Sequence, residues 1–390
     1  MAGVERGFSR RGFLLSGIAT GLLAQERPGG SFPSAMKRYA DPSTDFDVYR
    51  LTDPSYSSTL PAAYNRVIAH NSSFMLFCCG RNVSPQAYRL DLKSGETKEL
   101  ATVEDLDGSS LTLTPDNRSF CFFAGRSLFL SGLGSRPREL YKVPEGWERT
   151  AGLSVGPDGT HATFAERQGD GSRLRMVSLA QGAARTVLEA PFAISHPIAR
   201  PMRAQVLFRQ GDESLWLANS DGAEKHPLKL AAGRLGPADW APDGKTVLYL
   251  NFPEDSKQLT TIRECNPDAA SDKLVAKTSQ FAHFGFNRDT SVFVGASRSA
   301  ASPTILLLLR ITQRELTLCE HKASHPETTA PRFSPDAQRI YFQSDRDGQP
   351  AIYCMHVEHL VEKIDAAARD TAPPPVLIAG GSGVLLPKFL

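Results

Sequence analysis

The stretch GPADWAPDGKTVLYL, residues 236–250, decides the fold, because a Pro-Asp-Gly turn in it leads directly into an apolar run. In Ala241-Pro242-Asp243-Gly244, proline fixes φ at the second position of a type I turn, and glycine suits the fourth position. The run at 247–250 is short and apolar, as in a buried strand. The stretch therefore indicates a strand, a tight turn and a second strand.

The same unit recurs along the chain at a nearly constant distance. One turn position per unit gives Asn71, Pro115, Pro157, Pro201, Pro242, Asn287 and Pro335, with gaps of 44, 42, 44, 41, 45 and 48 residues. A period of about 44 residues built from short β-rich runs belongs to four-stranded propeller blades, whereas helical repeats would need apolar spacing of three and four. The sequence therefore predicts an all-β, seven-bladed β-propeller with four-stranded blades.

The turns also predict the order of the strands within a blade. We expect the Pro-Asp-Gly turn to join the innermost strand to the second strand, and Asp345-Arg346-Asp347-Gly348 to join the second strand of the last blade to the third. Residues 45–53 and 373–381 have the composition of strands, and we expect them to close the ring in a shared blade. Residues 355–370 carry apolar side chains at helical spacing, which predicts a helical insertion. One propeller domain is thus expected over 43–390.

The N-terminal 30 residues are expected to lie outside the propeller. Arg10 and Arg11 precede Phe13 and a short apolar stretch, rich in small residues, that ends near Ala24. This order is typical of a twin-arginine export signal. We expect residues 1–30 to be a signal peptide and linker, too short in their apolar part for a permanent membrane span, and the protein to be periplasmic or secreted.

Composition narrows the function classes. Lys and Arg number 44 against 42 Asp and Glu in 390 residues, so net charge gives no reason to expect nucleic acid as a partner. The six cysteines form no C-x-x-C pair and have no metal-ligand spacing, which favours buried thiols. Since the sequence has no nucleophile elbow, phosphate loop or zinc-binding helix, hydrolase and nucleotide-binding functions have no support.

A functional site is expected at one mouth of the central channel, where the segments just before the turns meet. These segments are residues 64–66, 109–110, 150–152, 195–196, 237–238, 281–283 and 325–330. His196, His283 and His325 fall on or beside this ring. Arginines near it can hold a carboxylate through two N–H groups; they are Arg66, Arg200, Arg203, Arg209 and Arg332. Each alone is as readily a structural or surface group, so it is their grouping that favours a site.

Several ordered motifs carry a family resemblance. They are YRLTDPSYSSTLPAAYNR (49–66), LDLKSGETKEL (90–100), TLTPDNRSFCFF (112–123), SHPIARP (195–201), GPADWAPDGKTVLY (236–249) and AHFGFN (282–287). Through these motifs, the chain after residue 43 resembles the oligogalacturonate lyase family. The resemblance implies a seven-bladed propeller that cleaves pectin-derived uronides by β-elimination with a bound divalent metal, typically manganese (Mn2+). The last repeat is also similar to TolB-type propellers.

The resemblance also implies metal ligands. His283 matches a metal-ligating histidine of the family, and His325 corresponds to a second ligand position. Thr328 and Ala330 stand where the family places two further ligands, and neither is a usual metal ligand. At most two of four ligands therefore remain.

The position of the catalytic base departs from the family as well. Pro237 stands where the family has a histidine thought to act as the base, and proline cannot accept a proton. Removal of the proton next to a uronate carboxylate needs a base and positive charge. A rearranged site would use His196 or His283 as the base, and Arg66 or Arg209 on the carboxylate.

Three hypotheses follow for the function. The first is an exported lyase that acts on uronic-acid oligosaccharides through the rearranged site, and the sequence leans towards it. The second is a non-catalytic propeller that binds an acidic sugar or a peptide. The third is a TolB-like propeller whose channel mouth meets a protein partner.

Overall fold

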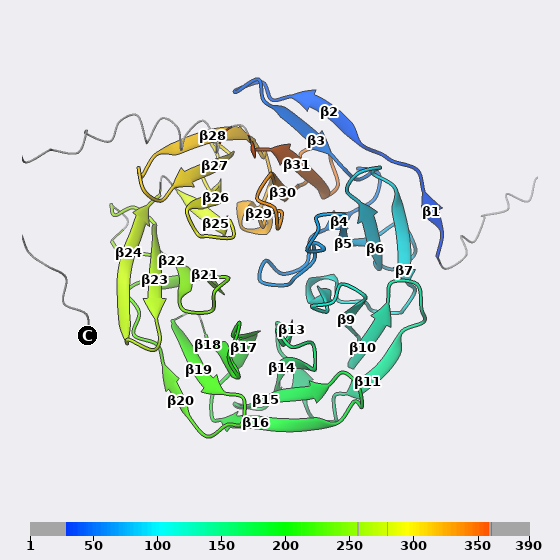
Figure 1. Cartoon of the computed structure of the whole chain (residues 1–390), viewed down its shortest axis with the longest axis vertical. Helices are drawn as coiled ribbons and strands as arrows, with labels where there is room; N and C mark the ends of the chain where they lie inside the picture. The colour runs from blue at the N-terminus through cyan, green and yellow to red at the C-terminus, as the bar shows by residue number, and fades with distance from the viewer. Residues whose placement is uncertain (1–28, 212, 256, 279, 359, 361–390) are drawn as a thin grey trace, which may run out of the picture.

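The computed structural model describes residues 29–211, 213–255, 257–278, 280–358 and 360. Over this part of the chain, seven antiparallel sheets follow one another in a ring around a common centre (Figure 1). Each sheet contains four strands of one blade, and three sheets carry a fifth strand at an edge. The predicted seven-bladed propeller is confirmed.

The strands of each blade run outwards from the centre of the ring. Blades 1 to 3 comprise β4 (Ser58–Thr59), β5 (Phe74–Cys79), β6 (Gln86–Asp91), β7 (Thr97–Ala101); β8 (Thr112–Leu113), β9 (Ser119–Ala124), β10 (Ser127–Gly132), β11 (Arg138–Lys142); and β13 (Ser154–Val155), β14 (His161–Gln168), β15 (Gly171–Ser178), β16 (Ala184–Ala190). Blades 4 to 6 comprise β17 (Ile194–Ala199), β18 (Gln205–Gln210), β19 (Ser214–Asn219), β20 (Lys225–Pro227); β21 (Arg234–Trp240), β22 (Val247–Phe252), β23 (Thr261–Asn266), β24 (Ser271–Lys277); and β25 (Phe281–Phe286), β26 (Val292–Ser297), β27 (Thr304–Leu309), β28 (Glu315–Glu320). Blade 7 comprises β29 (Arg332–Phe333), β30 (Arg339–Ser344), β31 (Ala351–His356) and β3 (Asp47–Arg50). The additional strands are β1 (Ser31–Phe32), β2 (Lys37–Ala40) and β12 (Glu148–Arg149), and two 3-10 turns are η1 (Gly108–Ser110) and η2 (Pro326–Thr328).

The Pro-Asp-Gly turn joins the two inner strands of blade 5, as predicted. The backbone N–H of Gly244 donates to the Ala241 carbonyl over 2.8 Å between β21 and β22. Gly244 has φ +67°, and a Cβ added there would collide with the carbonyl of Pro201 in the neighbouring blade. Glycine is therefore required both by the backbone conformation and by the close approach of blade 4.

The ring is closed by an N-terminal strand. β3 pairs antiparallel with β31, with Tyr49 opposite Cys354, and β2 pairs with β3 as a fifth strand. The propeller also begins earlier than the expected residue 43, because β1 pairs with β7 in blade 1. The expected C-terminal strand at 373–381 lies outside the described residues.

The first two residues of the predicted helical insertion belong to a strand. Residues 355 and 356 end β31 and pair with Ile340 and Arg339 of β30, so they are strand residues and not helical. The ladder of blade 7 overrides the local helical spacing here. The rest of the predicted insertion lies almost entirely outside the described residues.

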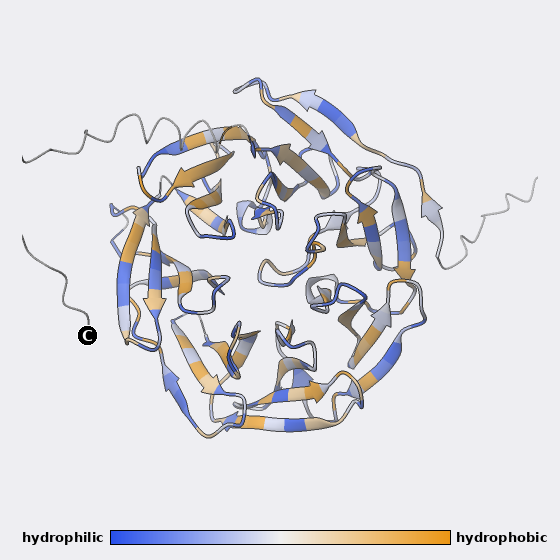
Figure 2. Ribbon diagram, in the orientation of Figure 1, coloured by the Kyte–Doolittle hydropathy of each residue, from blue (hydrophilic) through white to orange (hydrophobic). Residues whose placement is uncertain are grey.

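The core consists of apolar side chains packed between neighbouring sheets, and Figure 2 shows the apolar residues along the strands of the blades. Between blades 6 and 7, for example, Val294, Leu307 and Phe342 are completely buried in one cluster. Each such side chain contributes about 1.5–3 kcal/mol through burial. All six cysteines are buried and free, as expected, and burial raises the pKa of Cys78 to about 12. Among the described residues, no helix has the length and apolar character needed to cross a bilayer.

Candidate functional site

Two adjoining cavities lie among the inner strands, which surround the centre of the ring in Figure 1. The first, which we call the His196 chamber, has a volume of about 580 Å³ and is lined by Tyr64, His196 and Arg209 among others. The second, the Arg332 chamber, has a volume of about 530 Å³ and includes Arg66 and Arg332. Both volumes fall in the range of small-molecule sites.

The two chambers share part of their lining. Ala63, Pro237 and His283 border both of them. Pro237 from β21 and His283 from β25 thus lie where the chambers meet. A ligand longer than one sugar unit can therefore contact both chambers.

A distorted strand presents His196 to the first chamber. The pairing of β17 with β18 is irregular between Ser195 and Ile198, and His196 has φ +48°. Such backbone strain in a non-glycine residue is concentrated at functional sites. The imidazole Nδ1 lies 3.0 Å from the Ser195 hydroxyl oxygen, and the Tyr64 ring meets the imidazole edge-on at 6.1 Å. His196 is thus held with one ring nitrogen engaged.

Arginines dominate the charge of the His196 chamber. Arg209 projects from β18, directly opposite Ser195 in the sheet, and its Nη2 donates to the carbonyl of Gly236. Arg234 and Arg298 also line the chamber, and both guanidinium groups lie over the Phe252 ring, at 4.3 and 4.5 Å from its centroid. Among the described lining residues, Glu327 supplies the one carboxylate.

The Arg332 chamber is lined by three arginines, Arg66, Arg288 and Arg332, and by Asp239, and Arg66, Arg332 and Asp239 are poorly solvated. Desolvation lowers the pKa of Arg66, and it lowers the pKa of Arg332 to about 10. Desolvation raises the pKa of Asp239 to about 7, although Asp239 Oδ1 accepts a 2.8 Å hydrogen bond from the Trp240 N–H and the charge of Arg332 lies nearby. At neutral pH the chamber therefore holds more positive than negative charge.

His283 is a neutral group between the chambers. Its Nδ1 lies 3.2 Å from the carbonyl oxygen of Phe284, which can only accept, so Nδ1 carries the proton and Nε2 has the lone pair. Desolvation, and secondarily the charge of Arg332, lowers its pKa to about 4. His283 thus has a ligand-like nitrogen, but it is a weak base.

The other expected metal ligands do not join His283. His325 precedes η2, its side chain is 71% exposed, and its Nδ1 lies 3.3 Å from the Glu327 carboxylate. The Thr328 hydroxyl donates to the His325 carbonyl over 2.8 Å, and Ala330 has no donor atom. In the ranges that the structure describes, no three His, Cys, Asp or Glu side chains come together. The residues present therefore do not fit a metal centre of the usual kind.

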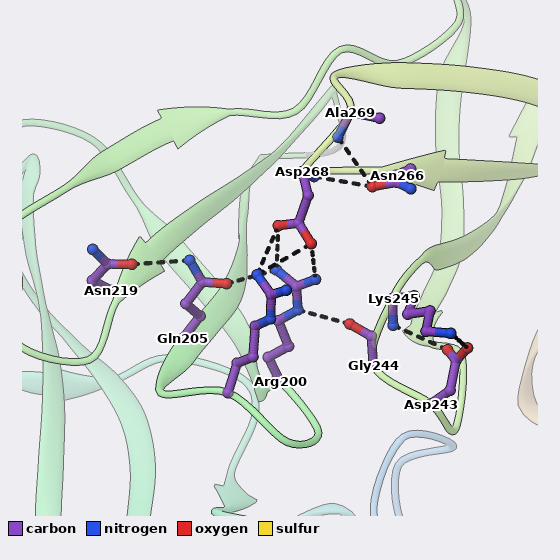
Figure 3. Close-up of polar contacts among 10 residues, drawn as sticks. Arg200, Gln205, Asn219, Asp243, Gly244, Lys245, Asn266, Asp268 and Ala269 are labelled. Carbon is purple, nitrogen blue, oxygen red and sulfur yellow. Dashed lines mark hydrogen bonds and ion pairs between the residues drawn. The ribbon is translucent and has the colours of Figure 1, made fainter. Parts of the chain in front are cut away.

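Two of the candidate arginines have a structural role instead (Figure 3). Arg200 is 1% exposed, and its guanidinium contacts both carboxylate oxygens of Asp268 at 3.0 and 2.8 Å. It also donates to Gln205 over 2.6 Å and to the Gly244 carbonyl over 2.7 Å, while Arg203 reaches Asp268 at 3.2 Å. These contacts bind blade 4 to blade 5, so neither arginine belongs to the chambers.

The predicted mouth is only partly the observed site. Residues from the segments 64–66, 195–196, 237–238, 281–283 and 325–330 line the chambers. In the described part of the chain, residues 109–110 and 150–152 line neither chamber.

Sequence reasoning missed Asp239, although a signal was present. Asp239 follows Pro237 by two residues in β21, and residues two apart in a strand share a face. Since Pro237 was expected at the channel, the same alternation points to Asp239. Its raised pKa depends on the surrounding blades and has no such local signal.

Comparison with known proteins identifies proteins that are similar to this chain. No protein-family model matches it. An oligogalacturonide lyase of Pectobacterium atrosepticum (strain SCRI 1043) is 24% identical over 383 residues, which cover 84% of this chain and 98% of that protein. An oligogalacturonate lyase of Dickeya dadantii (strain 3937) is 23% identical over 383 residues, with the same coverage.

A solved structure shares the fold. The structure of oligogalacturonate lyase in complex with manganese superposes with a TM-score of 0.80 at 23% identity, covering 86% of this chain and 100% of that one. The similarity thus extends over nearly the full length of the relatives. The resemblance indicated by the ordered motifs is confirmed: the chain is a seven-bladed β-propeller that is similar to oligogalacturonate lyases in sequence and in fold.

Proposed function

We propose that the protein is a lyase that cleaves uronic-acid oligosaccharides of the pectin type by β-elimination. The observation that carries the proposal is the arginine-rich lining of the two chambers, with Arg209 in one and Arg66 and Arg332 in the other. Such a lining attracts and orients carboxylates. The full-length similarity to two curated lyases supports the same substrate class.

The reaction requires a base and stabilisation of negative charge. The base takes the proton next to the uronate carboxylate, the electron pair forms a carbon–carbon double bond, and the glycosidic bond breaks as its oxygen takes up a proton. Negative charge develops on the carboxylate as the proton leaves, so a guanidinium beside that group lowers the barrier. In the His196 chamber we assign this role to Arg209, since the guanidinium groups of Arg234 and Arg298 lie over the Phe252 ring.

His196 is the base of the proposed reaction. It lines the same chamber as Arg209, and the hydroxyl of Ser195 orients its ring. His283 is a poorer choice, because a general base works best when its pKa lies near the working pH and that of His283 is about 4. The proposal thereby moves the role of base from the position of Pro237 to the neighbouring blade.

We propose no step through manganese for this chain. A similar protein binds manganese, but the donor groups around His283 do not assemble a metal centre in the described part of the propeller. Positive charge from arginine takes over the neutralisation of the carboxylate in the proposed reaction.

Export by the twin-arginine route, to the periplasm or the medium, is also proposed. Its support is the order of Arg10, Arg11 and the apolar stretch in the sequence. These residues lie outside the described part of the chain. Pectin fragments enter from outside the cell, so an exported lyase would meet its substrate there.

A second candidate function is binding of acidic oligosaccharides without cleavage. The presence of Pro237 at the expected base position, and of Thr328 and Ala330 at expected ligand positions, favours it. A protein partner at the channel mouth would be a further form of this binding role.

The test is formation of the unsaturated product from digalacturonate and trigalacturonate, followed by its ultraviolet absorbance. We expect His196→Gln to lower turnover at least about 100-fold, because general base catalysis contributes that much. The matched control is His226→Gln on the exposed outer strand β20, which should leave turnover unchanged. Binding without product in the wild-type protein would instead establish the second function.

A further inference from the structure

Arg332 is a buried arginine with incomplete hydrogen bonding. Arg332 is 8% exposed and lies on β29, the inner strand of blade 7. Nη2 donates to the Pro61 carbonyl over 2.7 Å and Nε makes a weak 3.4 Å contact with the Ala330 carbonyl. Nη1 is buried and has no hydrogen-bond partner in the described part of the structure. A buried donor left unpaired is costly, and such groups call for an explanation.

Arg200 is a buried arginine with a structural role, and its hydrogen bonds can be compared with those of Arg332. It has similarly little exposure, yet all three of its nitrogens donate, and a carboxylate accepts from two of them. Arg332 lacks such a carboxylate partner, since Asp239 influences its pKa electrostatically without forming an ion pair with it among the described residues. The difference indicates that Arg332 keeps its free N–H for a ligand.

Arg66 lies in the same chamber with the same deficiency. Its Nη1 is also buried without a hydrogen-bond partner in the described ranges. It comes from the segment before β5, in blade 1, next to the blade that carries Arg332. Two guanidinium groups with unpaired N–H donors therefore line one cavity of about 530 Å³.

The positive charge of Arg332 also accounts for the poor fit to a metal. Arg332 acts electrostatically on His283, the residue that the family resemblance assigns to the metal. In a poorly solvated channel, a guanidinium near a divalent cation would repel it strongly. The same charge attracts an anion.

We propose that Arg66 and Arg332 form a carboxylate-binding site for one uronate unit of the substrate, and that this site takes the place of a metal ion in the channel. The identity of the ligand as a uronate rests on the proposed function. Because Ala63, Pro237 and His283 border both chambers, a substrate with one carboxylate at Arg209 places a neighbouring unit here. The site thus selects acidic chains of at least two units.

The experiment is calorimetric binding of D-galacturonate and digalacturonate, with galactose as the neutral control, in buffer treated with a chelator; every protein compared carries His196→Gln, so that digalacturonate is bound and not cleaved. We expect Arg332→Gln to weaken binding of digalacturonate at least about tenfold, since a charge-assisted hydrogen bond is lost. Arg332→Lys keeps the positive charge but loses the paired N–H groups of the guanidinium, so it should retain only part of the wild-type affinity for digalacturonate. Arg314→Gln, on the exposed turn before β28, is the matched control.

A second variant guards against misfolding. If Arg332→Gln does not melt cooperatively, Arg66→Gln tests the same site from blade 1. Unchanged digalacturonate affinity in the folded variants, or wild-type affinity that appears only on adding manganese, would overturn the proposal. The outcome is separate from that of the lyase assay: carboxylate binding that depends on Arg332 in a protein without turnover keeps this site and refutes only the lyase function.

Discussion

Asp239 provides a direct test of the electrostatics of the channel. Its pKa is raised to about 7 from an ordinary value of 3.8, chiefly because its carboxylate is poorly solvated. The folded protein therefore holds this proton more tightly than the unfolded chain does. The favourable contribution is fully present below about pH 4 and is lost as the pH rises through about 7.

The shift sets the size of the expected effect. Each pKa unit corresponds to about 1.4 kcal/mol, so a shift of about three units gives an upper bound near 4 kcal/mol for the cost of the ionised group. Water in the channel screens part of this cost, and we expect about 2 kcal/mol. Asp239→Asn keeps an oxygen to accept from the Trp240 N–H but cannot ionise. The variant should thus be more stable than wild type by about 2 kcal/mol at pH 8 and about equal to it at pH 4.

The assay is urea unfolding of wild type and Asp239→Asn at several pH values, with the difference in free energy of unfolding plotted against pH. Changes in all other groups cancel in this difference. Asp170→Asn, in the exposed turn between β14 and β15, is the control and should show no pH-dependent difference. A flat difference for Asp239→Asn, or one that grows towards low pH, would refute the reasoning.

Two further predictions concern the blade contact and export. Asp268→Asn should lower the free energy of unfolding by about 2 kcal/mol, because it leaves the buried charge of Arg200 without its counter-charge. Asp243→Asn, nearby in Figure 3, should change the free energy of unfolding by less than about 0.5 kcal/mol. Urea unfolding of both variants tests this prediction, and equal effects would contradict it. Replacement of Arg10 and Arg11 by lysine should keep the protein in the cytoplasm on cell fractionation, and unchanged export would exclude the twin-arginine route.

Much of the fold could be predicted because its signals are local and repeated. The turn around Pro242 specifies two antiparallel strands with only its own residues, and seven such turns define the number of blades. Ring closure is less local. β3 and β31 pair across some 300 residues of sequence, and the composition of each strand does not indicate which strand it pairs with.

Site residues could be predicted from the sequence only where the position of a residue within its blade places it near the channel. His196, Arg209 and Arg66 were expected near the channel because each lies just before or after a turn, and all three line a chamber. Arg200 shares that position but turns towards Asp268 of the next blade, a contact that no sequence spacing indicates. The unpaired N–H of Arg332 likewise depends on how blades 1, 5 and 7 surround it.

The measurement that tests the central claim most directly is the rate of unsaturated product formation from trigalacturonate by chelator-treated protein, with manganese then added back in steps. The account predicts product in the metal-free protein, at a rate that falls sharply in His196→Gln and that manganese does not raise. Folded protein that forms no product until manganese is added, or none at any manganese concentration, would contradict a lyase that works through arginines in the channel.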